Sequence, residues 1–155
     1  DYGIGSQVPL SDLLNDLIIY SDNDAGHILY ENLGGWKEYK EAMTKYTDSI
    51  SENYYTMDNV TTANTMNDVV TYLYDHKEDY KGLIKNMEKA EPGEYLDRDT
   101  QLSMPQKYGM YDYALNSVGF VECNTSYSIV VLTSLGDKGA DVMANINRIA
   151  YEHFK

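Results

Sequence analysis

The sequence contains little that could brace or anchor the chain covalently. Among its 155 residues there is one cysteine, Cys123, which excludes an internal disulfide. The missing disulfides do not fix the compartment, since many exported bacterial domains also have none. No apolar run approaches the roughly 18 residues of a membrane-spanning helix. The chain begins at Asp1 rather than at methionine, so we expect a processed or cut product, from which a targeting segment or anchor could have been lost upstream.

Positive charge is also scarce. Twelve lysines and arginines stand against 25 aspartates and glutamates, which gives a net charge of −13. Nucleic acids and anionic membranes are bound through clustered basic residues, so this composition argues against both partners. The acidity is explained most simply as a solubility feature. The three histidines have no paired spacing with each other or with Cys123, and we predict neither a metal site nor a cofactor; they are His27, His76 and His153.

The first two thirds of the chain carry helical patterns. Apolar residues recur at helical spacing, which predicts five helices at about 11–20, 23–33, 36–46, 61–73 and 78–88. Ser11 is the predicted N-cap of the first helix, and Asp58 or Thr61 that of the fourth. Gly34 is placed to end the second helix in a left-handed conformation. The polar residues 47–59 and the irregular residues 91–104 are predicted loops.

After residue 104 the pattern changes to β-strands. Three strands are predicted at 107–112, 115–123 and 127–134, followed by a helix over 137–154. The run from Ile129 to Leu132 is continuously apolar, which predicts a strand covered on both faces. In the last helix, one face is predicted to hold Val142, Ile146 and Ile149.

The predicted fold class is therefore α+β. A helical region, residues 1–104, precedes the C-terminal part of an α/β region, residues 105–155, which consists of a three-stranded antiparallel sheet and a last helix. We find no linker long enough to separate independent domains and expect one compact unit.

A polar triplet, Ser21-Asp22-Asn23, lies between the first two predicted helices. Alone, such a triplet is usually a helix cap. Its surroundings, Leu-Leu-x-x-Leu-Ile-x-Tyr-Ser-Asp-Asn-x-Ala followed by Leu-Gly-Gly, resemble the helical core of class A β-lactamases and penicillin-binding proteins, in which Ser-Asp-Asn is one of three active-site motifs. The resemblance continues through residues 36–39 and 59–63, where Met66 closes a Thr-Thr-x-x-x-Met helix start.

The second motif is a variant form. Lys107-Tyr108-Gly109 opens the first predicted strand, where the family carries Lys-Thr-Gly or Lys-Ser-Gly. Here Tyr108 replaces the small hydroxyl residue. A lysine beside a glycine in a strand usually lies at a solvated sheet edge, so the three-residue match alone is weak evidence. It supports the resemblance because it opens the first strand after the helical region, where the family carries this motif.

The resemblance implies a role for each site residue. Ser21 would relay a proton toward the leaving group, and Asn23 would hydrogen-bond the nucleophile's lysine and a substrate carbonyl. Lys107 would supply positive charge for a substrate carboxylate. Gly109 would let the substrate approach as an added strand, and the amide of Met110 would be one of two oxyanion donors.

The third motif, the nucleophile's Ser-x-x-Lys, is absent from the chain. In the family it begins a helix upstream of Ser-Asp-Asn, so its place would be before Asp1. We interpret the chain as the C-terminal portion of a penicillin-recognising serine hydrolase, inactive alone. The intact parent would acylate its serine with a β-lactam, a peptidoglycan-like D-Ala-D-Ala peptide or an ester. The alternative is a non-catalytic binding or interaction module that kept the fold and lost the chemistry.

The resemblance carries three further implications. Class A β-lactamases place a water-activating glutamate on the loop after the helical pair, whereas residues 47–59 offer only Glu52 without the surrounding pattern. The parent therefore looks more like a peptidase or esterase. It would act outside the cytoplasm, secreted or in the cell envelope. The strand from Ile129 to Leu132 would lack its N-terminal neighbours, which predicts a homodimer through that edge or packing that covers it.

Overall fold

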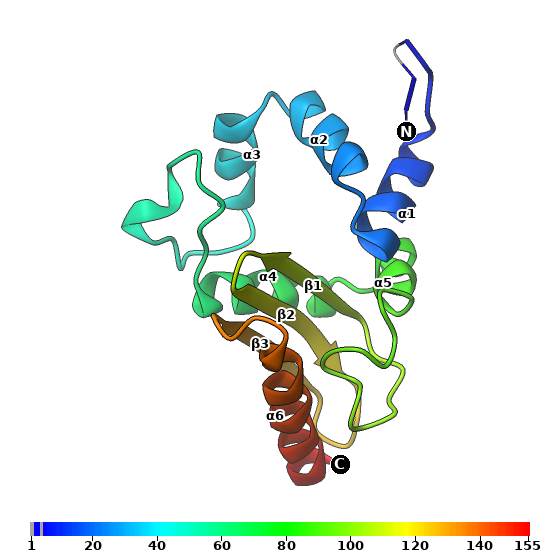
Figure 1. Cartoon of the computed structure of the whole chain (residues 1–155), viewed down its shortest axis with the longest axis vertical. Coiled ribbons are helices and arrows are strands. Elements are labelled where there is room, and N and C mark those ends of the chain that lie inside the picture. The colour runs from blue at the N-terminus through cyan, green and yellow to red at the C-terminus, as the bar shows by residue number, and fades with distance from the viewer. Residues whose placement is uncertain (1, 4) are drawn as a thin grey trace.

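Helices enclose a small sheet whose three strands follow one another in the chain (Figure 1). The computed structural model describes residues 2–3 and 5–155. Within them the α-helices are α1 Leu10–Tyr20, α2 Asn23–Asn32, α3 Trp36–Met43, α4 Ala63–Asp75, α5 Lys81–Met87 and α6 Lys138–Phe154, with a 3-10 helix, η1, at Glu52–Tyr54. The strands are β1 Gln106–Tyr111, β2 Ala114–Val121 and β3 Tyr127–Thr133. The predicted α+β fold and the order of its elements are confirmed.

Two of the predicted helix starts were wrong. Pro9 occupies the N-cap position of α1, and the Ser11 hydroxyl donates to Asp12 instead of capping the helix. The cap of α4 is Thr62, whose hydroxyl accepts from the Thr65 amide at 3.1 Å. Either threonine of a Thr-Thr pair can cap a helix, and tertiary packing decides which one does. Gly34 has a φ of +100°, the left-handed conformation that the sequence predicted.

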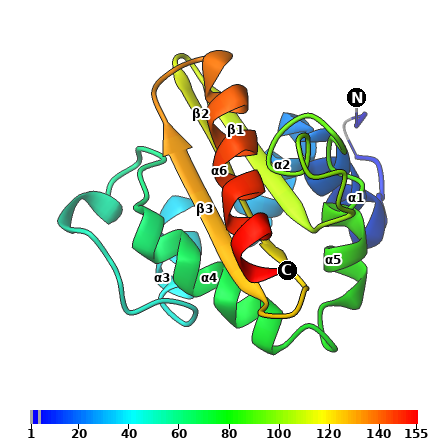
Figure 2. The ribbon, with the colours of Figure 1, turned by 90° about the horizontal axis from the view of Figure 1, so that it is seen from below.

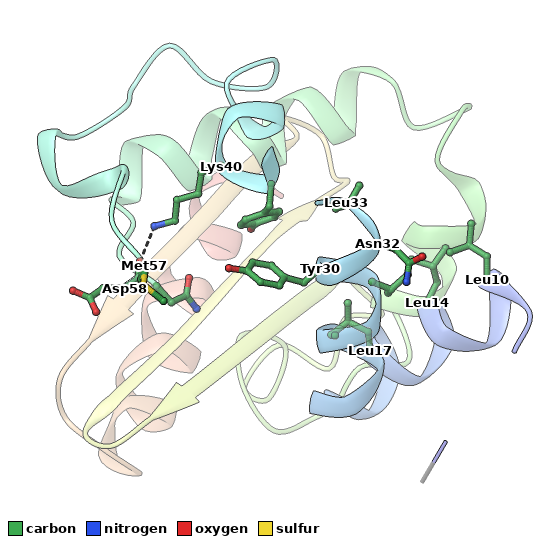
Figure 3. Close-up of a pocket in the computed structure, with 13 residues that line it drawn as sticks. Leu10, Leu14, Leu17, Tyr30, Asn32, Leu33, Lys40, Met57 and Asp58 are labelled. Carbon is green, nitrogen blue, oxygen red and sulfur yellow. Dashed lines mark hydrogen bonds between the residues drawn. The ribbon is translucent and has the colours of Figure 1, made fainter. Parts of the chain in front are cut away.

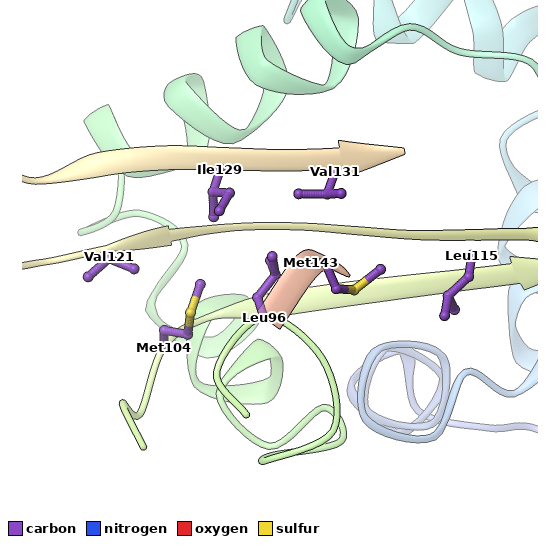
Figure 4. Packing of buried hydrophobic residues seen from close by; sticks show 7 residues of the cluster. All are labelled: Leu96, Met104, Leu115, Val121, Ile129, Val131 and Met143. Carbon is purple, nitrogen blue, oxygen red and sulfur yellow. The ribbon is translucent and has the colours of Figure 1, made fainter. Parts of the chain in front are cut away.

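The sheet has the order β1-β2-β3 with both pairs antiparallel, so β2 is central. Helix α6 covers one face of the sheet, and α4 lies against the other (Figure 2). Successive β2 side chains point to opposite faces, which sends Leu115 and Val121 toward α6 and Phe120 toward α4. The cluster under α6 is drawn in Figure 4 and comprises Leu96, Met104, Leu115, Val121, Ile129, Val131 and Met143.

Strand β3 is covered less completely than its sequence predicts. Ile129 and Val131 are buried, but Leu132 is 37% exposed. Its outer edge has no neighbouring strand within residues 2–3 and 5–155. An open strand edge presents unpaired backbone groups to any chain that can add to it.

Helix α6 has Val142, Ile146 and Ile149 on one face, as predicted, and packs against the sheet through a different face. Met143, Ala144 and Asn147 are buried. A Cβ added at Gly139 would lie 2.5 Å from the Thr133 hydroxyl, so glycine permits the start of the helix to approach the end of β3 closely. An apolar stripe is left on the outer face, with exposed fractions of 38% at Val142, 41% at Ile146 and 57% at Ile149.

Candidate active site

The predicted triplet forms the turn between α1 and α2. Ser21 follows the last residue of α1 with a φ of +53°, a conformation that is uncommon for a residue other than glycine. The amide of Asp22 donates to the Asp16 carbonyl at 3.1 Å. The carboxylate of Asp22 accepts from the Ala25 amide at 2.8 Å and caps α2. These bonds fix the turn and present the Ser21 hydroxyl beside the sheet.

The structure brings Ser21 and Lys107 together although 86 residues separate them in the chain. The Lys107 amine donates to Ser21 Oγ and also to the Tyr108 carbonyl, at 2.9 Å. Helix α1 has no basic residue in its last turn. The lysine of β1 therefore supplies the positive charge that the negative end of a helix dipole favours.

Burial lowers the pKa of Lys107 to about 8, and the Glu91 carboxylate opposes that shift. Removing an ammonium from water disfavours its charged form. A lysine with this pKa is charged in most molecules at neutral pH, and a small fraction of the molecules carry it neutral. It can therefore hold an anion or exchange a proton with the adjacent Ser21 hydroxyl.

We expect Lys107 to make stability depend on pH. Its pKa is about 8 in the folded chain and 10.5 ordinarily, so between these values the unfolded chain binds more protons than the folded one. The free energy of unfolding should therefore rise with pH in this window, and Lys107→Met should flatten the rise. Urea unfolding at about pH 7.5, 8.5 and 9.5 measures this. Lys89→Met, at an exposed lysine, is the control. A slope unchanged by Lys107→Met contradicts the expectation.

Strand β1 offers an open backbone edge beside Lys107. Pro105 and Phe120 lie opposite each other at the start of the β1–β2 ladder. They form a hydrogen-bonded pair, because the Phe120 amide donates to the Pro105 carbonyl at 3.3 Å. Hydrogen-bonded and non-hydrogen-bonded pairs alternate in an antiparallel ladder, so the Met110–Leu115 pair is non-bonded and the N–H and C=O of Met110 point away from β2. A Cβ at Gly109 would meet nothing within 4 Å. A substrate backbone therefore has room beside Gly109 and a free donor at Met110.

A cleft of about 270 Å³ lies between α3, the loop before α4 and the sheet. Lys107, Tyr108 and Gly109 line one side, and Asn59 and Thr61 are among the residues that line the other. The Thr61 hydroxyl is buried, and it has no hydrogen-bond partner within the described part of the chain. An unpaired buried hydroxyl is costly unless something polar reaches it. The cleft is therefore suited to a ligand with polar atoms.

An apolar groove of about 830 Å³ borders this cleft (Figure 3). Its walls come mainly from α1, α2 and α3, and it shares Tyr39, Lys40 and Asn59 with the cleft. Its apolar lining includes Leu10, Leu14, Leu17, Leu29, Leu33 and Met57, of which several are exposed to solvent. Exposed apolar surface of this extent marks a site that binds a ligand, a membrane or another protein element.

A family profile described as the β-lactamase enzyme family matches residues 1–154. The chain belongs to this family. No curated protein sequence gives a significant match. The match covers nearly the whole sequence. The assignment to the β-lactamase family therefore does not depend only on the short Ser-Asp-Asn and Lys-x-Gly motifs.

Solved β-lactamase structures share the fold. A variant of the last common ancestor of the class A β-lactamases of Gram-negative bacteria aligns with a TM-score of 0.80 at 20% identity, over 98% of this chain and 68% of that chain. A PBP-A mutant in an acyl-enzyme complex with penicillin G aligns at 0.78 with 15% identity, over 96% and 62%. A halotolerant bacterial β-lactamase aligns at 0.76 with 18% identity, over 97% and 68%. The chain therefore spans about two thirds of these proteins.

Other residues singled out for the β-lactamase site are exposed to solvent. Asn23 is the first residue of α2, and its side chain is exposed. Met110 is also exposed, although its backbone faces the open edge. Glu52 begins η1 on the surface, where it is solvated.

Among the described residues no cluster of three or more His, Cys, Asp or Glu side chains is arranged to hold a metal ion. Nor does any described helix have the length and hydropathy to span a bilayer.

Sequence reasoning missed two residues at this β-lactamase-family site. Lys40 is only 5% exposed, and its amine donates to the carbonyls of Tyr54 at 2.6 Å and Asp58 at 2.7 Å, which ties the loop before α4 to α3. Tyr95 stacks on Tyr108, with ring centroids 4.6 Å apart. Their sequence positions carry no signal, because Lys40 looks like a solvated helix lysine and Tyr95 lies in an irregular loop.

Proposed function

We propose that this chain is the C-terminal part of a penicillin-recognising serine hydrolase, which transfers acyl groups on a serine that the chain does not contain. The observation that carries the proposal is the contact between Ser21 and Lys107, the lysine that lines the cleft together with Tyr108 and Gly109. Acyl transfer needs a nucleophile, a proton path, an anchor for the substrate and oxyanion donors. The chain would offer the proton path, the substrate anchor and one of the two oxyanion donors, and it lacks a Ser-x-x-Lys nucleophile.

Each site residue has a role in this proposal. Lys107 holds a substrate carboxylate and donates a hydrogen bond to the Ser21 hydroxyl, which relays a proton to the leaving group. Gly109 leaves space for the substrate backbone, and the Met110 amide stabilises the oxyanion. Asn23 would reach the nucleophile's lysine only once that segment is in place, since its side chain is exposed in this chain.

Three unpartnered surfaces support the view that further protein packs here. They are the apolar groove along α1 and α2, the stripe on α6 at Val142, Ile146 and Ile149, and the open edge of β3. Each would be covered by a folded segment, and the related structures extend beyond this chain by about a third of their length. In this proposal the groove seats the helix that carries the nucleophile, next to the cleft that holds Lys107.

The substrate class follows from what the loop before α4 lacks. Glu52 is the only glutamate of residues 47–59, and it is solvated. Without a glutamate to activate water, an acyl-enzyme would hydrolyse slowly. We therefore propose a peptidase or esterase, acting on a D-Ala-D-Ala-type peptide or an ester and acylated by β-lactams, in preference to an efficient β-lactamase. Its place would be outside the cytoplasm, secreted or in the cell envelope.

A non-catalytic binding or interaction module is the second candidate. It is favoured by Tyr108, which stands where the family pattern has a small hydroxyl residue, and by the missing nucleophile. The gene decides between the two. A Ser-x-x-Lys encoded upstream of Asp1, with penicillin labelling of that longer product, supports the hydrolase. A gene that begins near Asp1 supports the binding module.

For the isolated chain we also propose a homodimer through β3. Two copies would pair the open edges of their strands from Ile129 to Leu132. Sedimentation should show a dimer whose fraction rises with concentration. Val130→Pro should shift it to monomer, since proline removes a backbone donor from the strand. A monodisperse monomer at high concentration with this strand exposed contradicts the proposal.

A further inference from the structure

We propose that the stacked rings of Tyr95 and Tyr108 position the Lys107 amine at the cleft, replacing the small hydroxyl residue of the family pattern with an aromatic support. The inference rests on the proposed function of Lys107 as the anchor for a substrate carboxylate. It adds two residues whose task is to hold that anchor. They act through Lys107, and so they are positioning residues.

The Lys107 amine is in close contact with the ring beside it. It lies 4.1 Å from the centroid of the Tyr108 ring. The four other lysine–ring contacts among the described residues are longer, at 4.9 to 5.7 Å. A cation over an aromatic face is attracted by the ring's quadrupole, and more strongly when it is shielded from water, as this amine is.

Carboxylates do not hold this amine. Within residues 2–3 and 5–155, no carboxylate oxygen lies within 4 Å of the Lys107 amine. Glu91 acts on it only from a greater distance. The amine's close partners are the Ser21 hydroxyl, the Tyr108 carbonyl and the Tyr108 ring. A lysine held by a neutral ring keeps its charge available for an incoming anion, whereas an ion pair would already satisfy it.

The Tyr108 ring is itself held in place by Tyr95, which stacks on it with ring planes inclined by 21°. The residue after Tyr95, Leu96, is fully buried and fixed through its backbone. Its amide donates to Gln106 Oε1 at 3.0 Å, and its carbonyl accepts from Asn147 Nδ2 at 2.8 Å. Hydrogen bonds to β1 and to α6 therefore hold the loop that carries Tyr95 in place. Because Tyr95 stacks on Tyr108, it restricts the movement of the Tyr108 ring, and this ring in turn restricts the Lys107 amine.

The experiment measures where the Lys107 side chain lies, in the 155-residue chain labelled with ¹³C in lysine. The ε-methylene signal of Lys107 is identified by its loss in Lys107→Met. Ring currents shift protons above an aromatic face upfield, so this signal should lie upfield of that from the exposed Lys89. Tyr108→Phe keeps the ring and should keep the shift. Tyr108→Thr, which introduces the family's residue, should lose it.

Tyr95→Leu is the decisive second variant, because it leaves Tyr108 in place and removes only its support. We expect the upfield shift of the Lys107 signal to shrink toward the position of Lys89, with the backbone amide spectrum otherwise retained. Tyr95→Phe, which preserves the stack, should restore it. The proposal is overturned if the Lys107 signal stays in its original place in Tyr95→Leu or in a folded Tyr108→Thr. No acyl chemistry enters this measurement, so its outcome is independent of penicillin labelling.

Discussion

Fluorescent penicillin is expected to leave the 155-residue chain unlabelled and to acylate a longer product of the same gene that carries Ser-x-x-Lys. The physical reason is that, in the proposed function, the 155-residue chain holds only part of the active site and the nucleophile lies on another segment. In the proposed site, Lys107, Ser21 and the Met110 amide would bind and stabilise an acyl-transfer transition state, but the chain lacks the Ser-x-x-Lys that supplies an activated nucleophile. Labelling is followed by gel fluorescence, and the modified serine is identified by peptide mass spectrometry.

Variants of the longer product separate the site from the scaffold. Lys107→Met removes the charge that holds the carboxylate and should lower the acylation rate about 100-fold or more, the usual cost of losing one electrostatic contact to the transition state. Lys89→Met, at an exposed lysine outside the cleft, should acylate at the original rate. Covalent labelling of the 155-residue chain itself, at Ser21 or any other serine, would contradict the proposed function.

Gly119→Ala is expected to destabilise the fold severely, although it adds a single methyl group. Gly119 lies in the central strand β2, where an added Cβ would sit 2.4 Å from the Pro105 carbonyl oxygen and 3.0 Å from the Met104 side chain. The nearer atom belongs to the backbone and cannot rotate away. Relieving the clash must separate β1 from β2, at a cost of about 3 kcal/mol or more in the free energy of unfolding. Urea unfolding followed by circular dichroism measures it.

Gly109→Ala is the matched control in the neighbouring strand. Its added Cβ meets nothing within 4 Å, so the free energy of unfolding should change by less than about 0.5 kcal/mol. If both variants unfold alike, the close approach of Pro105 to Gly119 is not what limits the packing of β2. The pair also separates two uses of glycine in this chain, since one permits the sheet to pack and the other leaves space at the open edge.

Local patterns in the sequence were enough to predict the type and order of the α-helices and strands, although not the N-caps of α1 and α4. Helical and alternating periodicities reflect which side chains a local element can bury, and they predicted the α+β fold, the order of the elements and the left-handed Gly34. The Ser-Asp-Asn and Lys-x-Gly motifs indicated the family that the profile over residues 1–154 then showed. The absence of Ser-x-x-Lys was equally plain, because a missing motif needs no structure to be seen.

Tertiary structure alone decided which faces are buried and which distant residues meet. The pattern of α6 predicted Val142, Ile146 and Ile149 on one face, but only the structure shows that this face is exposed while Met143, Ala144 and Asn147 pack inward. Lys107 reaches Ser21 only because β1 passes the end of α1, and Tyr95 reaches Tyr108 only because Leu96 is anchored to β1 and α6. Such contacts depend on packing between segments far apart in the chain, and periodicity within one segment carries no information about them.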